Sequence, residues 1–204
     1  MKDFISHLNQ KDTSFQCFDA NDGSEQLVFT VKVHHLLGKP ATEKQIEALK
    51  AIIPDNQEII DLYQLHNGMT LYRHVETARK NYSNGDASGI TFYPIYQLKK
   101  HNKEWKSYNI DVLHEEYMFD FQKYGVTFGE VTYSMNSFVL YEGKVYYDDH
   151  DGGDDTPVGE NIEDFLSKII ADPAQFLYDR GCHTRYSDSS TETQWIPKVF
   201  NIEH

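Results

Sequence analysis

The sequence predicts an α+β domain in which a mostly antiparallel sheet is flanked by helices. Helical periodicity is gathered before and after a central run of strand-like segments, an arrangement typical of this fold class. Within that run, residues 137–141 and 144–148 flank Glu142-Gly143, a two-residue loop compatible with a β-hairpin. The sequence lacks the regular alternation of strand and helix that a doubly wound fold requires.

The first elements that the pattern predicts are a strand and a helix. From Gln26 to Leu36 the residues alternate with a period of two and include β-branched side chains, which predicts a strand. Thr42 and Gln45 have the spacing of a capping box. The apolar residues after this pair follow at helical spacing: Ile46, Leu49, Ile52 and Ile53. We therefore expect a helix to begin at Thr42.

A second helix is expected to follow at once. Pro54 ends the first helix and suits the first turn of the next one. Asn67-Gly68 offers the left-handed conformation at which many helices end. Residues 69–72 then predict a short strand. The polar stretch 73–89 predicts an exposed loop or an insertion.

The second half of the chain contains most of the expected strands. Residues 90–95 predict a strand stopped at Pro94, and 97–105 suit a short helix. The aromatic-rich stretch 110–124 favours neither period. Residues 125–131 return to a strand-like pattern.

Helical pattern returns after the hairpin. An acidic loop over 148–160 leads to a helix that Asn161 caps and Asp172-Pro173 ends. Residues 174–179 can add one further turn. The tail beyond it is polar at first and carries a few apolar residues near its end.

Charge and composition exclude several classes of function. The chain has 32 Asp and Glu against 19 Lys and Arg, a formal net charge of −13. A field of this sign repels phosphate backbones, so we expect no nucleic-acid partner. No apolar run has the length of a membrane span, and the start lacks a signal-peptide pattern. Cys17 and Cys182 suit free thiols. We therefore expect a cytoplasmic protein without membrane attachment.

The candidates for catalysis have simpler structural interpretations. His34 and His35 are adjacent on a predicted strand, so their side chains point to opposite faces and cannot chelate together. Cys182 and His183 are neighbours in sequence, which is not the geometry that a nucleophile and its base need. The chain contains no nucleotide-binding or hydrolase signature. We expect no enzyme, no metal site and no cofactor.

The densest polar feature is the acidic turn, residues 148–155. Its five carboxylates and two glycines could surround a calcium ion. The EF-hand order fails, however, because Gly159 stands where a bidentate Glu is required, and a strand leads into the turn. A structural or partner-facing turn is the preferred interpretation.

Five segments occur in a characteristic order. An Ile-Pro pair, a helix and Asn-Gly occupy 53–68; a strand followed by a helix begins at 90–95; and a strand containing Phe-Gly occupies 125–129. A late strand runs into an Asp-His turn over 145–153, and a helix closes the set at 161–171. This order resembles the SUKH superfamily, which contains the Smi/Knr-type fungal cell-wall regulators and many bacterial toxin-immunity proteins.

The resemblance implies a SUKH-like core domain over residues 40–172. Residues 1–39 would form an N-terminal extension with a strand, and 173–204 a C-terminal extension. The implied function is non-enzymatic: a binding protein, in bacteria often an antidote to a toxin encoded beside it. An acidic antidote would be steered to the basic surface of a toxin such as a nuclease.

Two other functions remain open at this stage. One is a regulatory scaffold or adaptor that binds an endogenous protein; the other, less favoured, is a calcium-dependent or hydrolytic enzyme. For a protein partner, we expect the binding surface to include the acidic turn and an aromatic anchor beside it. The expected residues are Tyr146, Asp148, Asp149, Asp151, Asp154 and Asp155.

Overall fold

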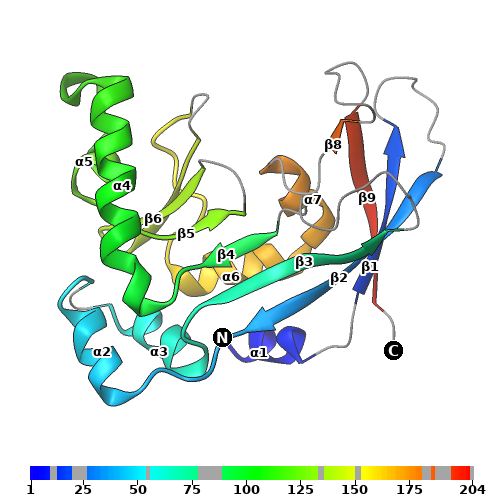
Figure 1. The fold of residues 1–204 in the computed structure, drawn as a ribbon, viewed down its shortest axis with the longest axis horizontal. Helices are drawn as coiled ribbons and strands as arrows, with labels where there is room; N and C mark the ends of the chain where they lie inside the picture. Colours follow the sequence, from blue (N-terminus) through cyan, green and yellow to red (C-terminus); the bar gives the residue numbers. More distant parts are fainter. Residues whose placement is uncertain are drawn as a thin grey trace.

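In the computed structural model, one continuous antiparallel sheet runs through the whole molecule (Figure 1). The structure describes residues 1–9, 13–19, 27–53, 56–77, 89–132, 136–149, 153–180, 185–186 and 194–202. The strands are β1 (Thr13–Asp19), β2 (Leu27–Leu37), β3 (Met69–Thr77), β4 (Ile90–Phe92), β5 (Val126–Val131), β6 (Ser137–Tyr141), β7 (Lys144–Asp148), β8 (Arg185–Tyr186) and β9 (Gln194–Ile202). Their order in the sheet is β7-β6-β5-β4-β3-β2-β1-β9-β8. The predicted α+β class is confirmed.

Helices pack around the sheet, on both faces of the hairpin and also against β9 near the other end. They are α1 (Lys2–Leu8), α2 (Glu43–Lys50), α3 (Gln57–Leu65), α4 (Ile95–Leu113), α5 (Asp120–Tyr124), α6 (Ile162–Ala171) and α7 (Pro173–Asp179), with a 3-10 turn η1 at Glu115–Tyr117. In Figure 1, α4 and α5 stand at the opposite end of the molecule from β1 and β9. No helix in the described part of the chain has the length and apolar character needed to cross a membrane.

The hairpin of β6 and β7 divides its side chains between two apolar cores. Phe138, Leu140 and Val145 belong to the main core, together with Phe165 of α6. Val139, on the opposite face of β6, packs with Trp105 of α4 and Phe121 of α5 in a second, smaller core. This division follows from the alternation of side chains along a strand. The turn takes positive φ at both Glu142 (48°) and Gly143 (80°), as a two-residue hairpin loop favours.

The Asn67-Gly68 pair joins the end of α3 to the beginning of α4. Gly68 has a φ of +84°, and a Cβ built on it would lie 2.8 Å from the backbone nitrogen of Pro94. The side-chain oxygen of Asn67 accepts a 2.8 Å hydrogen bond from the backbone N–H of Ile95, the first residue of α4. α3 ends at Leu65 with His66 in an extended conformation, so the left-handed Gly68 is present but lies beyond the helix end where the stop was expected. Asn67 also caps the beginning of α4.

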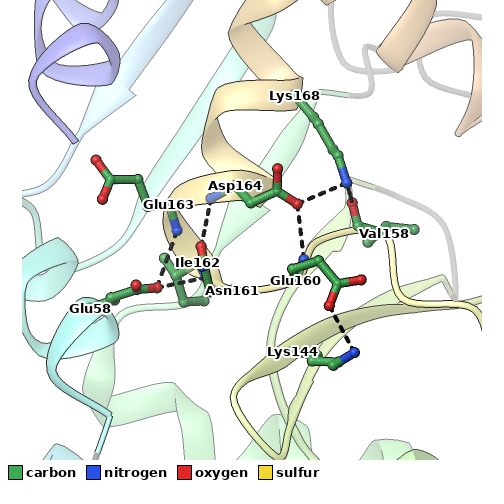
Figure 2. Close-up of polar contacts among 9 residues, drawn as sticks. All are labelled: Glu58, Lys144, Val158, Glu160, Asn161, Ile162, Glu163, Asp164 and Lys168. Atoms are coloured by element: carbon green, nitrogen blue, oxygen red, sulfur yellow. Dashed lines mark hydrogen bonds and ion pairs between the residues drawn. The ribbon is translucent and has the colours of Figure 1, made fainter.

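The N-terminus of α6 is held by side chains from two parts of the chain (Figure 2). Asn161 accepts a hydrogen bond from the backbone N–H of Asp164, as predicted for an N-cap. The carboxylate of Glu58, in α3, accepts from the backbone N–H groups of Ile162 (2.8 Å) and Glu163 (3.3 Å). A carboxylate at this position also complements the helix dipole. These contacts fix α6 against α3.

Two of the expected elements, one helix and one loop, had the wrong extent. The helix expected over 97–105 is the longer α4, and β3 continues to Thr77, where an exposed loop was expected from residue 73. Residues 78–88 of that stretch, including Asn84-Gly85-Asp86, lie outside the described residues. The segments 1–39 and 173–204, expected as extensions, contribute α1, β1, β2, α7, β8 and β9, and their strands continue the same sheet. These strands continue the sheet because β2 pairs with β3, β1 pairs with β2, and β9 pairs with β1.

A buried polar cluster connects α1 to the sheet. The hydroxyl of Tyr72 lies 2.8 Å from Nε2 of His7, and the backbone N–H of Tyr72 donates to Nδ1 of His35 over 3.3 Å. Tyr72 is fully buried and has a φ of 54°, in the left-handed region that side-chain-bearing residues rarely adopt. Burial lowers the pKa of His7. Burial, with smaller contributions from His7 and His34, lowers the pKa of His35 to about 4.

Candidate functional site

The acidic turn begins with a buried carboxylate. Asp148 is the last residue of β7 and is 6% exposed. Its Oδ2 accepts hydrogen bonds from the indole N–H of Trp105 (2.5 Å) and the side-chain amide of Asn109 (2.9 Å). Its Oδ1 accepts from the side-chain amide of Gln122 (2.6 Å). Asp148 thus ties the end of β7 to both α4 and α5.

Local structure explains why these donors converge. Trp105 and Asn109 are one helical turn apart on α4 and so lie on the same face. Gln122 has a double role, because its side-chain oxygen also accepts from the backbone N–H of Phe119 at the beginning of α5. On β7, Asp148 points to the same face as Tyr146, toward the second core. The three hydrogen bonds to Asp148 each link residues that are at least 26 positions apart in sequence.

Neutral hydrogen-bond donors surround the buried carboxylate of Asp148. Its hydrogen-bond donors are an indole and two amides, and among the described residues no side chain forms an ion pair with it. A buried carboxylate is tolerated only when such donors replace water. The sequence placed Asp148 on a partner-facing surface; the structure places it at the base of a hollow.

The other expected surface residues are spread around this carboxylate. Tyr146 is half-buried, because its ring stacks on Phe121 of α5 with centroids 4.8 Å apart and planes at 7°. Asp149 is half-buried, while Asp154 and Asp155 are exposed. The side chain of Asp154 also accepts from the backbone N–H of Thr156. Asp151 lies outside the described residues.

A hollow of about 150 Å³ lies between the C-terminal half of α4, η1, α5 and the acidic turn. We call it the acidic hollow. Aromatic side chains contribute to its lining from α4 (Tyr108), η1 (Tyr117) and the start of α5 (Phe119 and Phe121). Its carboxylates are Asp148, Asp149 and Asp154, and none of its described lining residues is Lys, Arg or His. The acidic hollow therefore combines apolar surface with carboxylate side chains.

Exposed apolar side chains are concentrated beside the acidic hollow. Of the eight large hydrophobic residues that are exposed in the described part of the chain, five fall within residues 110–124: Ile110, Val112, Tyr117, Phe119 and Tyr124. This stretch is aromatic-rich in the sequence, but its pattern predicted no role for it. The aromatic content of 110–124 is visible in the sequence. Because the stretch has no clear period, the sequence does not predict which of its side chains face solvent.

A second hollow, of about 190 Å³, lies on the other side of Tyr108 and Trp105. In it the ring of His101 stacks on Tyr93, with centroids 3.7 Å apart. The Tyr93 hydroxyl donates a 2.6 Å hydrogen bond to Glu130, and burial together with this contact raises the pKa of Tyr93.

Among the described residues, no group of three or more His, Cys, Asp or Glu side chains is placed to hold a metal ion. His150, Asp151 and Gly152, the centre of the acidic turn, are outside that set, as is Cys182.

Fold and site together define an α+β protein with an acidic, aromatic-lined hollow beside exposed apolar side chains. Comparisons of the chain with known protein families, with characterised proteins and with solved structures return no match. The geometry of the site and the order of the five segments are the features that bear on function.

Proposed function

We propose that this chain is a non-enzymatic binding protein of the immunity type, which neutralises a toxin by direct contact. The observation that carries the proposal is the concentration of exposed apolar side chains over 110–124 beside the acidic hollow. A contiguous apolar patch on a protein surface commonly marks a protein-binding site.

The composition of this surface suits a protein partner with a basic face. Aromatic side chains such as Tyr117 and Phe119, which are 72% and 38% exposed, can act as anchors in an interface core. Around them, Glu115, Glu116 and Asp120 are exposed carboxylates. The net charge of −13 adds long-range attraction toward a basic surface. A nuclease toxin has such a surface where it binds its substrate.

The order of segments that resembles the SUKH superfamily supports the same function, because immunity proteins are numerous in it. A regulatory scaffold that binds an endogenous protein is the second function consistent with that resemblance. The same aromatic surface would serve it, so the partner distinguishes the two functions.

Co-expression with the toxin encoded beside this chain tests the proposal. We expect the chain to restore growth and to elute with the toxin as one complex in size-exclusion chromatography. Absence of both protection and complex with that toxin would contradict the proposal. Capture of a housekeeping protein in place of a toxin would favour the scaffold function.

A further inference from the structure

We infer that α1 is a pH-controlled segment, which leaves the sheet when the imidazoles of His7 and His35 take up protons. The inference concerns a conformational change and does not depend on the proposed toxin-binding function. It is carried by the hydrogen bonds of the two rings, by their burial and by the backbone conformation of the residue between them, Tyr72.

The hydrogen bond of His35 requires a neutral ring. Its Nδ1 accepts the backbone N–H of Tyr72 over 3.3 Å, so the proton of the neutral ring is on Nε2. A proton added to Nδ1 would face the N–H of Tyr72, and two donors would then oppose each other. Nε2 offers no compensation, because it is buried and has no hydrogen-bond partner among the described residues. Protonation of His35 therefore breaks the contact with β3.

The contact that would break holds a residue in an unfavourable conformation. Tyr72 is fully buried and has a φ of 54°, which costs free energy in a residue that carries a side chain. Such a conformation persists only where the surrounding contacts maintain it. The hydrogen bond to His35 is one of these contacts, so its loss favours a rearrangement at this point of the sheet.

A charge on His7 would act in the same direction. His7 is 8% exposed, and its ring centroid lies 5.5 Å from that of His35. Its Nε2 lies 2.8 Å from the hydroxyl of Tyr72, which can accept as well as donate, so this bond survives protonation. Two imidazolium rings at such a distance nevertheless repel each other, because a buried site screens them poorly.

The element that can separate the two rings is α1. It has seven residues, lies at the start of the chain and buries only Phe4, His7 and Leu8. β2, which carries His35, pairs with β1 on one side and with β3 on the other. Departure of α1 would expose the rings to water at a smaller cost in packing and hydrogen bonds than departure of β2.

No described carboxylate is placed to stabilise the two charges. Neither ring forms an ion pair within the described residues. The side chains of Lys32 and His74 on the same strands lie outside the described part. The other charged or titratable groups on the elements packed against the rings are half-exposed, exposed or already paired: Lys2 and Asp3 on α1, His34 on β2, Arg73 on β3, and on α6 Glu163 with the amino group of Met1 and Asp164 with Lys168.

The size of the effect follows from the titration of His35. Burial lowers its pKa to about 4 while α1 is in place, whereas a histidine in water has a pKa of about 6.5. Between pH 7 and pH 5, this difference raises the equilibrium constant for departure of α1 about twentyfold. Burial also lowers the pKa of His7, so its titration adds to the effect with the same sign.

Amide hydrogen exchange in the full chain measures the departure of α1. The reporters are the backbone amides of His7 and Leu8, and the references are those of Phe165 and Ile169 in α6, which belong to the main core. Protection factors are compared at pH 7 and pH 5 after correction for the intrinsic effect of pH on exchange. We expect the protection of α1 to fall about twentyfold, and to stay at least tenfold below that of α6 at both pH values.

Histidine variants assign the effect to the buried rings. His35→Gln retains an acceptor for Tyr72 and does not titrate, so the fall should shrink to less than fivefold. His34→Gln is the matched control, because its side chain points to the opposite face of β2, and the fall should remain at least tenfold. His7→Gln should reduce the fall as well, and it replaces His35→Gln if that variant does not fold.

Equal protection of α1 at pH 7 and pH 5 would overturn the inference. Equal protection of α1 and α6 at both pH values would also overturn it, because α1 would then open only with the whole molecule. The same holds if His34→Gln reduces the fall as much as His35→Gln or His7→Gln, since the buried rings would not be its source.

Discussion

The indole N–H of Trp105 donates a 2.5 Å hydrogen bond to the carboxylate of Asp148, which lies 43 residues further along the chain. This contact connects the middle of α4 with the end of β7. Because Asn109 and Gln122 bind the same carboxylate, one side chain positions the two helices that line the acidic hollow. The first residue of the acidic turn is therefore a structural anchor for the surface that we propose to bind the partner.

Asp148→Asn should destabilise the protein. An amide offers one acceptor oxygen and turns an N–H₂ group toward a donor, so at least one buried N–H loses its partner. We expect the free energy of unfolding to fall by about 3 kcal/mol, measured by urea denaturation. Asp155→Asn removes the same charge at an exposed position and should stay within about 0.5 kcal/mol of the parent. Equal effects of the two changes would contradict the anchoring role.

Tyr117→Ser combined with Phe119→Ser should abolish toxin binding while the fold remains intact. Both side chains are exposed, so their loss removes interface area and little core packing. We expect affinity for the toxin to fall at least tenfold by calorimetry, with the melting temperature nearly unchanged. Tyr96→Ser is the matched control, because Tyr96 is 75% exposed and lies at the other end of α4. If Tyr96→Ser weakened binding equally, the aromatic segment would not be the binding surface.

Stability should fall as the pH drops from about 6.5 to about 4. Burial holds the pKa of His35 near 4 in the folded protein, below its usual 6.5, so between these values the unfolded chain binds more protons. The stabilisation is complete above pH 6.5 and is lost as the pH falls toward 4. The full effect is about 3 kcal/mol, measurable from urea midpoints at a series of pH values.

His35→Gln is the variant that isolates this effect. Glutamine retains an acceptor for the backbone N–H of Tyr72 and does not titrate. The variant should be less stable than the parent at pH 7 and should show a flatter dependence below pH 6.5, with the remaining slope due to His7 and to carboxylates. An unchanged slope would show that His35 does not govern the acid sensitivity.

Glu58→Ala should destabilise the contact between α3 and α6. The carboxylate accepts from the backbone N–H groups of Ile162 and Glu163, so its removal leaves the first turn of α6 less satisfied. We expect a loss of about 1 kcal/mol in urea denaturation. Glu47→Ala, which breaks an exposed pair with Lys50, should cost at most about 0.5 kcal/mol. A Glu58 effect no larger than the Glu47 effect would refute the capping role.

Calcium should not stabilise the protein. The carboxylate of Asp148 is engaged by N–H donors, which disfavours a calcium ion at the base of the hollow. We expect the melting temperature to be the same in millimolar calcium and in excess EDTA, and Asp149→Asn and Asp151→Asn to leave that comparison unchanged. A calcium-dependent rise that Asp149→Asn removes would restore the metal interpretation of the acidic turn.

The sequence alone predicted the caps and turns that depend on contacts between residues close together in the chain. The capping box of Thr42 and Gln45, the left-handed Gly68, the hairpin at Glu142-Gly143 and the N-cap Asn161 all occur as predicted. Each depends on contacts within a few residues, so spacing and residue type are enough. The α+β class follows from the order of such elements.

The tertiary structure alone decided which distant groups surround the carboxylate of Asp148 and which aromatic side chains of 110–124 remain exposed. Periodicity reveals that one face of an element is buried, but it does not reveal which element covers that face. The three donors to Asp148 come from residues 26 to 43 positions away, and only the packing of α4 and α5 on the hairpin brings them together. The sequence therefore determines the negative charge of the acidic turn. The hollow beside it exists only because α4 and α5 pack on the hairpin.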